Sequence, residues 1–172
     1  MAWVKEQFKV PFSLDEFVEA KREFRGRIVR AEWGTADPND QHYNPWVFPE
    51  NAPEDIRERQ RERGAIAIRI EIMPIDQPWD NIYEWYSVSS SRLSKWYYFM
   101  DALLRLRIPF ETTGNTVPEK LNSFCRSLVG VEAKWSDHTD LPTVGGRVIK
   151  RLLLPVEYYG KFEVGGMERV RI

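Results

Sequence analysis

The stretch that most constrains the fold of this chain is residues 65–73, AIAIRIEIM. Isoleucine occupies every second position, and Arg69, Glu71 and Met73 follow in the alternate positions. Because successive side chains of a strand point to opposite faces, this alternation predicts a strand with one buried face. One-sided burial is typical of an antiparallel sheet, so we expect the chain to be built around such a sheet.

Four further segments have the composition of strands. GRIVRAEWGT at 26–35 is bounded by glycines, and IYEWYSVS at 82–89 follows residues 65–73 closely enough to form a hairpin. VEAKWSD at 131–137 and RVIKRLLLPVEYYGKF at 147–162 come near the end of the chain. Pro155 predicts a bend or an edge position in the last strand, because proline cannot donate to a sheet.

Two helices have recognisable ends. Ser13 and Glu16 have the spacing of a capping box, which predicts a helix that ends at Gly26 and carries Phe24 on its apolar face. A second helix is expected from Pro118, a favoured first-turn residue.

A third helix, around residues 93–104, is rich in aromatic residues. Helical spacing predicts an apolar stripe, with Tyr98 pointing away from it. The stripe comprises Leu93, Trp96, Tyr97, Met100, Leu103 and Leu104.

Residues 36–64 form a long connection between the first two expected strands. Its first half is rich in turn-forming residues and holds Tyr43, Trp46 and Phe48. Its second half, EDIRERQRER at 54–63, alternates acidic and basic residues, a pattern typical of a solvated helix or arm. Connections of this length are often functional.

The element order predicts a mainly β protein with helices (α+β), built on a five-stranded antiparallel Greek-key barrel. Here the chain resembles the OB-fold single-stranded-DNA-binding proteins, particularly those of phages and their relatives. The resemblance covers residues 26–162 and rests on element order, on GRI…AEW at 26–33 and on LVGVEAKW…KRLLLPVEYYG at 128–160. We therefore expect one OB-like domain at 26–172, with helices between the third and fourth strands, and the capping box adds a helical extension at 1–25.

The resemblance also implies non-enzymatic binding of single-stranded DNA, in DNA replication or repair, with little sequence preference. Such proteins stack bases on aromatic rings and neutralise phosphates with Lys and Arg, on strands two and three and the neighbouring loops. Alternation puts Tyr83 and Trp85 on one face of their strand and Ile82, Glu84 and Tyr86 on the other. The candidate binding residues are Arg30, Tyr43, Trp46, Arg69, Tyr83, Trp85, Lys134, Lys150 and Arg151.

The chain departs from the bacterial members in its last residues. Those members typically end in an acidic tip that binds partners, whereas this chain ends GGMERVRI. We therefore expect no partner recruitment by an acidic tail. The net charge of −1 gives no overall attraction to nucleic acid, so binding would need a local basic surface.

Catalytic signals are few. The sequence has no P-loop, no G-x-S-x-G and no dinucleotide-binding glycine pattern, and we expect neither an enzyme nor a cofactor. Glu132 and Lys134 have the E-x-K spacing of metal-dependent nucleases, but alternation on the surface of a strand explains them better. Cys125 lies on an apolar helix face, which favours a core residue over a thiol nucleophile.

Other functions stay open. A protein-interaction module with an OB-like barrel is the main alternative, because abundant aromatics and near-neutral charge also suit protein interfaces. Carbohydrate binding through exposed tryptophans is a third candidate, and RNA could replace DNA. A single cysteine and the absence of a long apolar segment lead us to expect a cytoplasmic chain with no membrane partner; homo-oligomerisation is left open.

Overall fold

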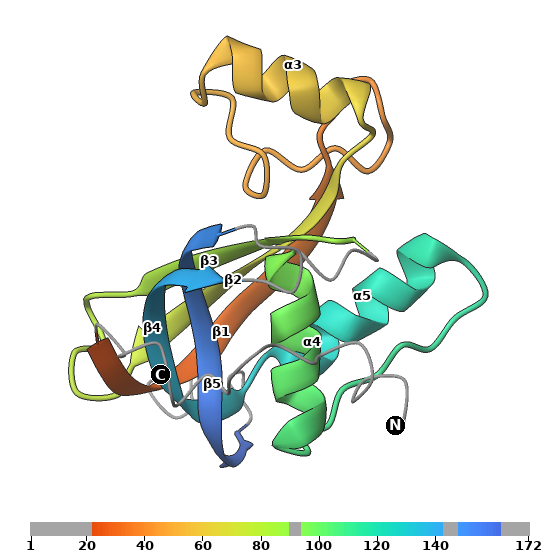
Figure 1. Ribbon diagram of the computed structural model, residues 1–172. Coiled ribbons are helices and arrows are strands. Elements are labelled where there is room, and N and C mark those ends of the chain that lie inside the picture. The colour runs from red at the N-terminus through yellow and green to blue at the C-terminus, as the bar shows by residue number, and fades with distance from the viewer. Residues whose placement is uncertain (1–21, 90–93, 143–147, 163–172) are drawn as a thin grey trace.

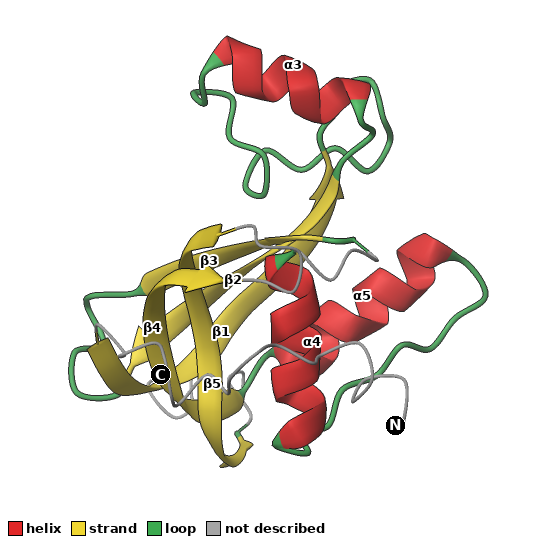
Figure 2. Ribbon diagram, viewed as in Figure 1, coloured by secondary structure: helices red, strands yellow, loops and turns green. Residues whose placement is uncertain are grey.

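The computed structural model describes residues 22–89, 94–142 and 148–162 (Figure 1). The described part is mainly β with helices, which confirms the expected fold class (Figure 2). The elements in chain order are β1 (Arg22–Thr35), α3 (Glu54–Glu62), β2 (Ile66–Pro74), β3 (Ile82–Ser87), α4 (Lys95–Arg105), α5 (Val117–Leu128), β4 (Val131–Pro142) and β5 (Val148–Lys161).

The five strands form one antiparallel sheet in the order β3-β2-β1-β4-β5. β1 lies at its centre, pairing with β4 through its first half and with β2 through its second half. A register shift between Ile28 and Arg30 marks an irregularity in β1, of the kind that bends a strand. β5 is an edge strand, as Pro155 predicts, and its register with β4 shifts where Pro155 pairs with Trp135.

The isoleucines of β2 form the centre of the core, as their alternation predicts. Ile68, Ile70 and Ile72 are completely buried. Burying a side chain of this size contributes about 1.5–3 kcal/mol each. On β3 the ring of Tyr86 stacks on Phe99 of α4, with ring centroids 4.2 Å apart. The two helices between β3 and β4 complete this core, α4 against β5 and β3 and α5 against β1.

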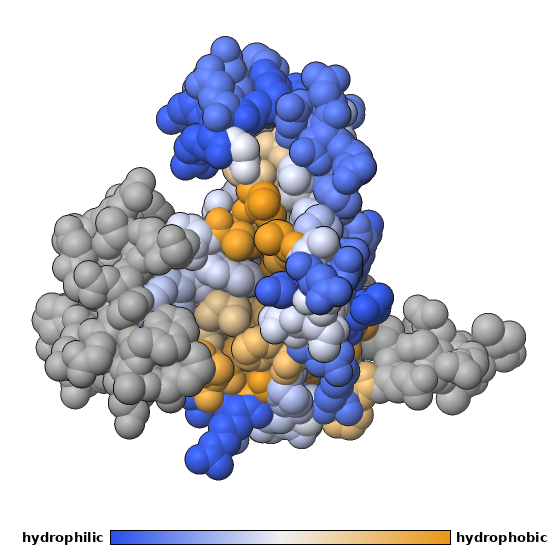
Figure 3. Space-filling view, turned by 90° about the vertical axis from the view of Figure 1, so that its right-hand side faces the viewer, coloured by the Kyte–Doolittle hydropathy of each residue, from blue (hydrophilic) through white to orange (hydrophobic). Residues whose placement is uncertain are grey.

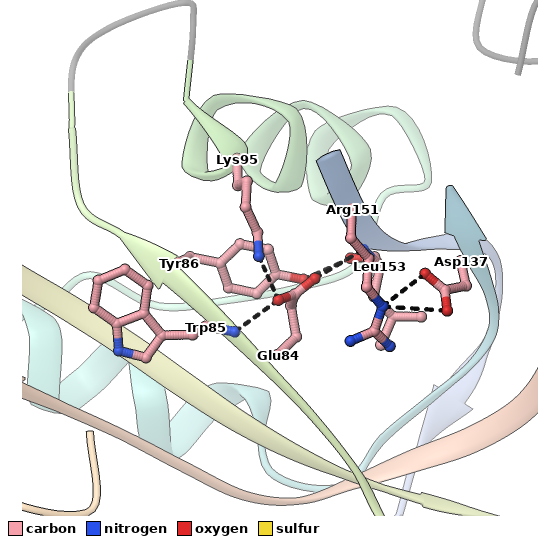
Figure 4. Close-up of polar contacts among 7 residues, drawn as sticks. All are labelled: Glu84, Trp85, Tyr86, Lys95, Asp137, Arg151 and Leu153. Atoms are coloured by element: carbon pink, nitrogen blue, oxygen red, sulfur yellow. Dashed lines mark hydrogen bonds and ion pairs between the residues drawn. The ribbon is translucent and has the colours of Figure 1, made fainter. Parts of the chain in front are cut away.

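Side chains of β3 join the two edges of the sheet (Figure 4). The Tyr86 hydroxyl donates to the Leu153 carbonyl of β5 at 2.7 Å, and the Leu153 amide donates to the Glu84 carboxylate at 2.8 Å. Lys95 of α4 and the Trp85 amide donate to the other carboxylate oxygen. Within the described ranges β3 and β5 share no backbone pairing, so their contact depends on side chains of β3. We call the hydrogen bonds of Glu84 and Tyr86 to Leu153 the β3–β5 contact.

Two expectations about aromatic residues were wrong. Tyr98 does not point away from the protein: it is 2% exposed, because α4 packs against two strands and buries more than one stripe. Phe24 belongs to β1 rather than to a helix, and it lies opposite Trp135 of β4. Residues 22–25 are therefore part of the sheet, while the rest of the expected N-terminal helix lies outside the described residues.

The charged segment 54–63 forms the helix α3, as the charge alternation predicts. It has no buried residue, and Glu54 forms ion pairs with both Arg57 and Arg61. Figure 3 shows this arm as a hydrophilic projection at the top of the molecule, with apolar residues below it. In the described part of the chain, no helix has the length and apolar character needed to span a membrane.

The β3–β5 contact predicts that two tyrosines of β3 contribute unequally to the free energy of unfolding. Tyr86→Phe leaves the buried Leu153 carbonyl without its donor, and we expect the free energy of unfolding to fall by about 1–3 kcal/mol. Tyr83→Phe, on the exposed face, should change it by less than about 0.5 kcal/mol. Urea unfolding followed by circular dichroism measures both; equal losses would contradict the importance of this hydrogen bond.

Candidate functional site

The long connection after β1 is held against the strand by Asn44. Its side-chain amide donates to the Trp33 carbonyl at 3.1 Å and to Glu32 at 2.9 Å. A Cβ at Gly34 would collide with Asn44, so only glycine permits this close approach. The Asn44 side-chain oxygen accepts from the Trp46 backbone amide at 3.0 Å, and this hydrogen bond fixes the backbone at Trp46.

β2 and β3 hold the same loop from the other side. Arg69 donates to the Trp46 carbonyl at 2.8 Å, and the Trp85 indole donates to the Val47 carbonyl at 2.7 Å. Phe48 packs edge-on against Trp85, with ring centroids 5.4 Å apart. A second, small hydrophobic core results, formed by Ala36, Val47, Phe48, Ala65 and Ala67. The loop therefore covers the outer face of the sheet in a defined position.

Four residues from four segments meet on this outer face. The guanidinium of Arg30 from β1 lies 3.8 Å from the ring centroid of Trp46. That of Arg69 from β2 lies 4.8 Å from Trp46 and 4.6 Å from Tyr83 of β3. The rings of Trp46 and Tyr83 meet edge-on at 6.4 Å. We call Arg30, Trp46, Arg69 and Tyr83 the arginine–aromatic cluster.

The charges in this cluster are not fully compensated. Arg30 forms an ion pair with Glu32 on the same strand. Arg69 forms no ion pair within the described residues, and the nearby Glu71 instead accepts a hydrogen bond from Asn81. With Tyr83 41% exposed, the cluster offers an accessible ring beside a free positive charge. Such a surface suits a ligand with flat rings and negative groups.

A second set of arginine–aromatic contacts continues along β1. Arg25 lies 4.2 Å from the ring centroid of Tyr159, and Arg27 lies 4.3 Å from that of Phe162. Both arginines donate to Glu132 of β4, which is 3% exposed. Burial raises the pKa of the Glu132 carboxyl, but the hydrogen bonds from Arg27 and Arg25 outweigh burial and leave the pKa lowered.

The structure brings together four of the residues expected in the site: Arg30, Trp46, Arg69 and Tyr83. Trp85 adjoins them, but its indole N–H is occupied by the loop. Tyr43 belongs to the loop itself and donates to the Phe48 carbonyl.

The remaining expected cations lie in other contacts. Lys134 is 3.5 Å from Glu23, and Arg151 pairs with Asp137 across β4 and β5 (Figure 4). The side chain of Lys150 lies outside the described residues. In the part of the chain that the structure describes, the ion pairs of Lys134 and Arg151 lie outside the arginine–aromatic cluster.

Sequence reasoning missed several exposed or stacked residues. It did not single out Arg25, Arg27, Tyr159 and Phe162, because their contacts depend on the pairing of strands far apart in the chain. It also passed over Trp79, which is 81% exposed in the turn between β2 and β3. The dipeptide Pro78-Trp79 in a polar turn is the signal that could have identified an exposed ring.

The catalytic alternatives gain no geometric support. Glu132, the carboxylate of the E-x-K motif, is engaged by two guanidiniums. Among the described residues, no three Asp, Glu, His or Cys side chains gather in a metal-binding group. Burial raises the pKa of the Cys125 thiol to about 12, so the thiol stays protonated at neutral pH.

Comparisons of the chain with protein-family models, with curated proteins and with solved structures give no match. The geometry of the site is therefore the basis for any statement about function.

The lowered pKa of Glu132 predicts a pH-dependent contribution to stability. A carboxyl with a lowered folded-state pKa stabilises the protein above the ordinary glutamate pKa, and this stabilisation is lost as pH falls through the folded-state value. Glu132→Gln should therefore lower the free energy of unfolding by about 1–2 kcal/mol at pH 7. This loss is small for hydrogen bonds to a charged group because Arg25 is half-exposed and water screens its charge.

Urea unfolding of both proteins from pH 7 down to pH 3.5 measures the difference. The difference in the free energy of unfolding between wild type and Glu132→Gln should decrease as the wild-type carboxyl becomes protonated. Glu111→Gln, at an exposed position, is the matched control and should show no gap at either end. A difference between wild type and Glu132→Gln that stays constant with pH would contradict the ionic role.

Proposed function

We propose that this protein binds single-stranded DNA, without catalysis, at the arginine–aromatic cluster. The observation that carries the proposal is the Arg69 guanidinium, held between the rings of Trp46 and Tyr83 without an ion pair in the described residues. Single-stranded nucleic acid is bound where aromatic faces stack bases and cations follow the phosphates. The cluster combines both groups on one exposed face.

The fold supports an OB-like barrel as part of the same proposal. The order β3-β2-β1-β4-β5 is what a five-stranded barrel gives when it is opened between β3 and β5. The side-chain hydrogen bonds of Glu84 and Tyr86 to Leu153 span that gap. In an OB-fold, ligands bind on strands two and three and the adjoining first loop, and these segments supply Arg69, Tyr83 and Trp46 here.

In the proposed mechanism the four residues have different roles. Tyr83 stacks a base on its exposed ring, contributing about 1–3 kcal/mol. Arg69 and Arg30 neutralise phosphates, while Trp46, which already lies against both guanidiniums, holds them in place. The single-stranded DNA would continue along β1 towards Arg27, whose guanidinium also lies over an aromatic ring. Stacking accepts every base, so the cluster itself would have little sequence preference.

A protein-interaction module remains the second candidate, and the exposed end of the β2–β3 turn favours it. Trp79 is 81% exposed there and Ile75 is 36% exposed. Exposed aromatic residues of this kind are enriched at protein interfaces. A carbohydrate site is less well supported, because the aromatic cluster is flanked by arginines rather than by neutral polar groups.

Binding to fluorescein-labelled oligo-dT, followed by anisotropy at low salt, tests the proposal. We expect saturable binding at micromolar protein, weakened about 5- to 150-fold by Tyr83→Ala. Arg69→Ala should weaken binding and reduce the slope of log K against log salt by about 0.7, the value for one phosphate contact to a single strand. Arg126→Ala, exposed in the last turn of α5, is the matched control and should change neither quantity.

Absence of saturable, salt-sensitive binding would overturn the proposal. In that case, an oligomer or complex lost in Trp79→Ala would support the interaction module instead. Sedimentation velocity of the wild type and of Trp79→Ala provides that comparison.

A further inference from the structure

A hollow of about 290 Å³ lies beside the arginine–aromatic cluster. This open hollow is bordered by the long loop, the helix α3 and the outer face of β2 and β3, and Arg69 belongs both to its wall and to the cluster. Its volume is close to the lower end of the range for small-molecule sites. Its lining residues are Val47, Phe48, Pro49, Ala52, Gln60, Arg69 and Trp85.

Most of this wall is apolar and fixed. Phe48 and Trp85 pack against each other edge-on, and the Trp85 indole N–H is already bonded to the Val47 carbonyl. The wall therefore offers ring and methylene surface without free polar atoms from these residues. A flat, largely apolar ligand fits such a surface better than a charged or strongly hydrated one.

Two side chains supply polarity. Arg69 uses one N–H for the Trp46 carbonyl, which leaves its other donors free to face a ligand. The side-chain amide of Gln60, on α3, makes no hydrogen bond in the described part of the chain, while its backbone carbonyl accepts from the Ala65 amide. Arg69 thus borders the hollow with a charged side chain, and Gln60 adds an amide that both donates and accepts.

We infer that this hollow binds one guanine base of the single strand held at the cluster, an inference that rests on the proposed function. Guanine presents two neighbouring acceptors, O6 and N7, and arginine is their commonest partner. The amide oxygen of Gln60 accepts from the base's own N–H groups. Thymine lacks such neighbouring acceptors, because its N3–H donor separates O2 from O4. The aromatic wall of Trp85 holds the ring, and Arg69 joins the hollow to the phosphate-binding surface.

The test compares oligo-dT with the same oligomer carrying one central dG or one central dA. Wild-type protein should bind the dG oligomer about fivefold or more tightly than oligo-dT, since a good bidentate contact discriminates by at least that factor. Gln60→Ala, which removes the acceptor for the N–H groups of guanine, should reduce this preference and keep the oligo-dT affinity. Ala52→Phe, which fills the hollow, should lose the preference in the same way. Glu58→Ala, an exposed change on α3, is the control and should keep it.

The outcomes separate the two proposals. Equal affinity for all three oligomers, with oligo-dT bound, would overturn the guanine site alone. A dA oligomer bound more tightly than the dG oligomer, or a Gln60→Ala protein that keeps the dG preference, would also overturn it. Free guanosine monophosphate that competes as well as the dG oligomer would overturn the link to the cluster. Failure to bind oligo-dT would overturn both proposals.

Discussion

The buried carboxylate of Glu84 is the interaction on which the rest of the structure depends. A carboxylate that is 5% exposed is stable only when its oxygens are paired. Lys95 from α4 and the Leu153 amide from β5 supply that pairing, so one side chain positions a helix and the far edge of the sheet. Because Glu84 points inwards, strand alternation forces Tyr83 and Trp85 outwards.

The outer face depends in turn on a loop that has its own small core. Hydrogen bonds with Asn44, Arg69 and Trp85 fix the loop backbone at Trp46 and Val47. A long connection with many turn residues would otherwise be free to move. The arginine–aromatic cluster is therefore tied to the strands beneath it, although one of its rings comes from the loop.

Local patterns in the sequence were enough to predict the features that depend on the spacing of neighbouring residues. The buried isoleucines of β2, the outward direction of Tyr83 and the solvated helix α3 all follow from local spacing. The contacts of Arg25 with Glu132 could not be predicted in this way, because the partners are separated by 107 positions and meet only through the register of β1 with β4. Tyr98 was misjudged because two strands pack against one helix.

The arginine–aromatic cluster has a thermodynamic consequence. A free arginine side chain loses up to about 2 kcal/mol of rotamer entropy when it is immobilised. In this protein the guanidiniums of Arg30 and Arg69 are already held against rings before any ligand arrives, so much of that entropy is lost at folding. A ligand at this surface would then meet pre-organised side chains, and its binding would lose less side-chain entropy.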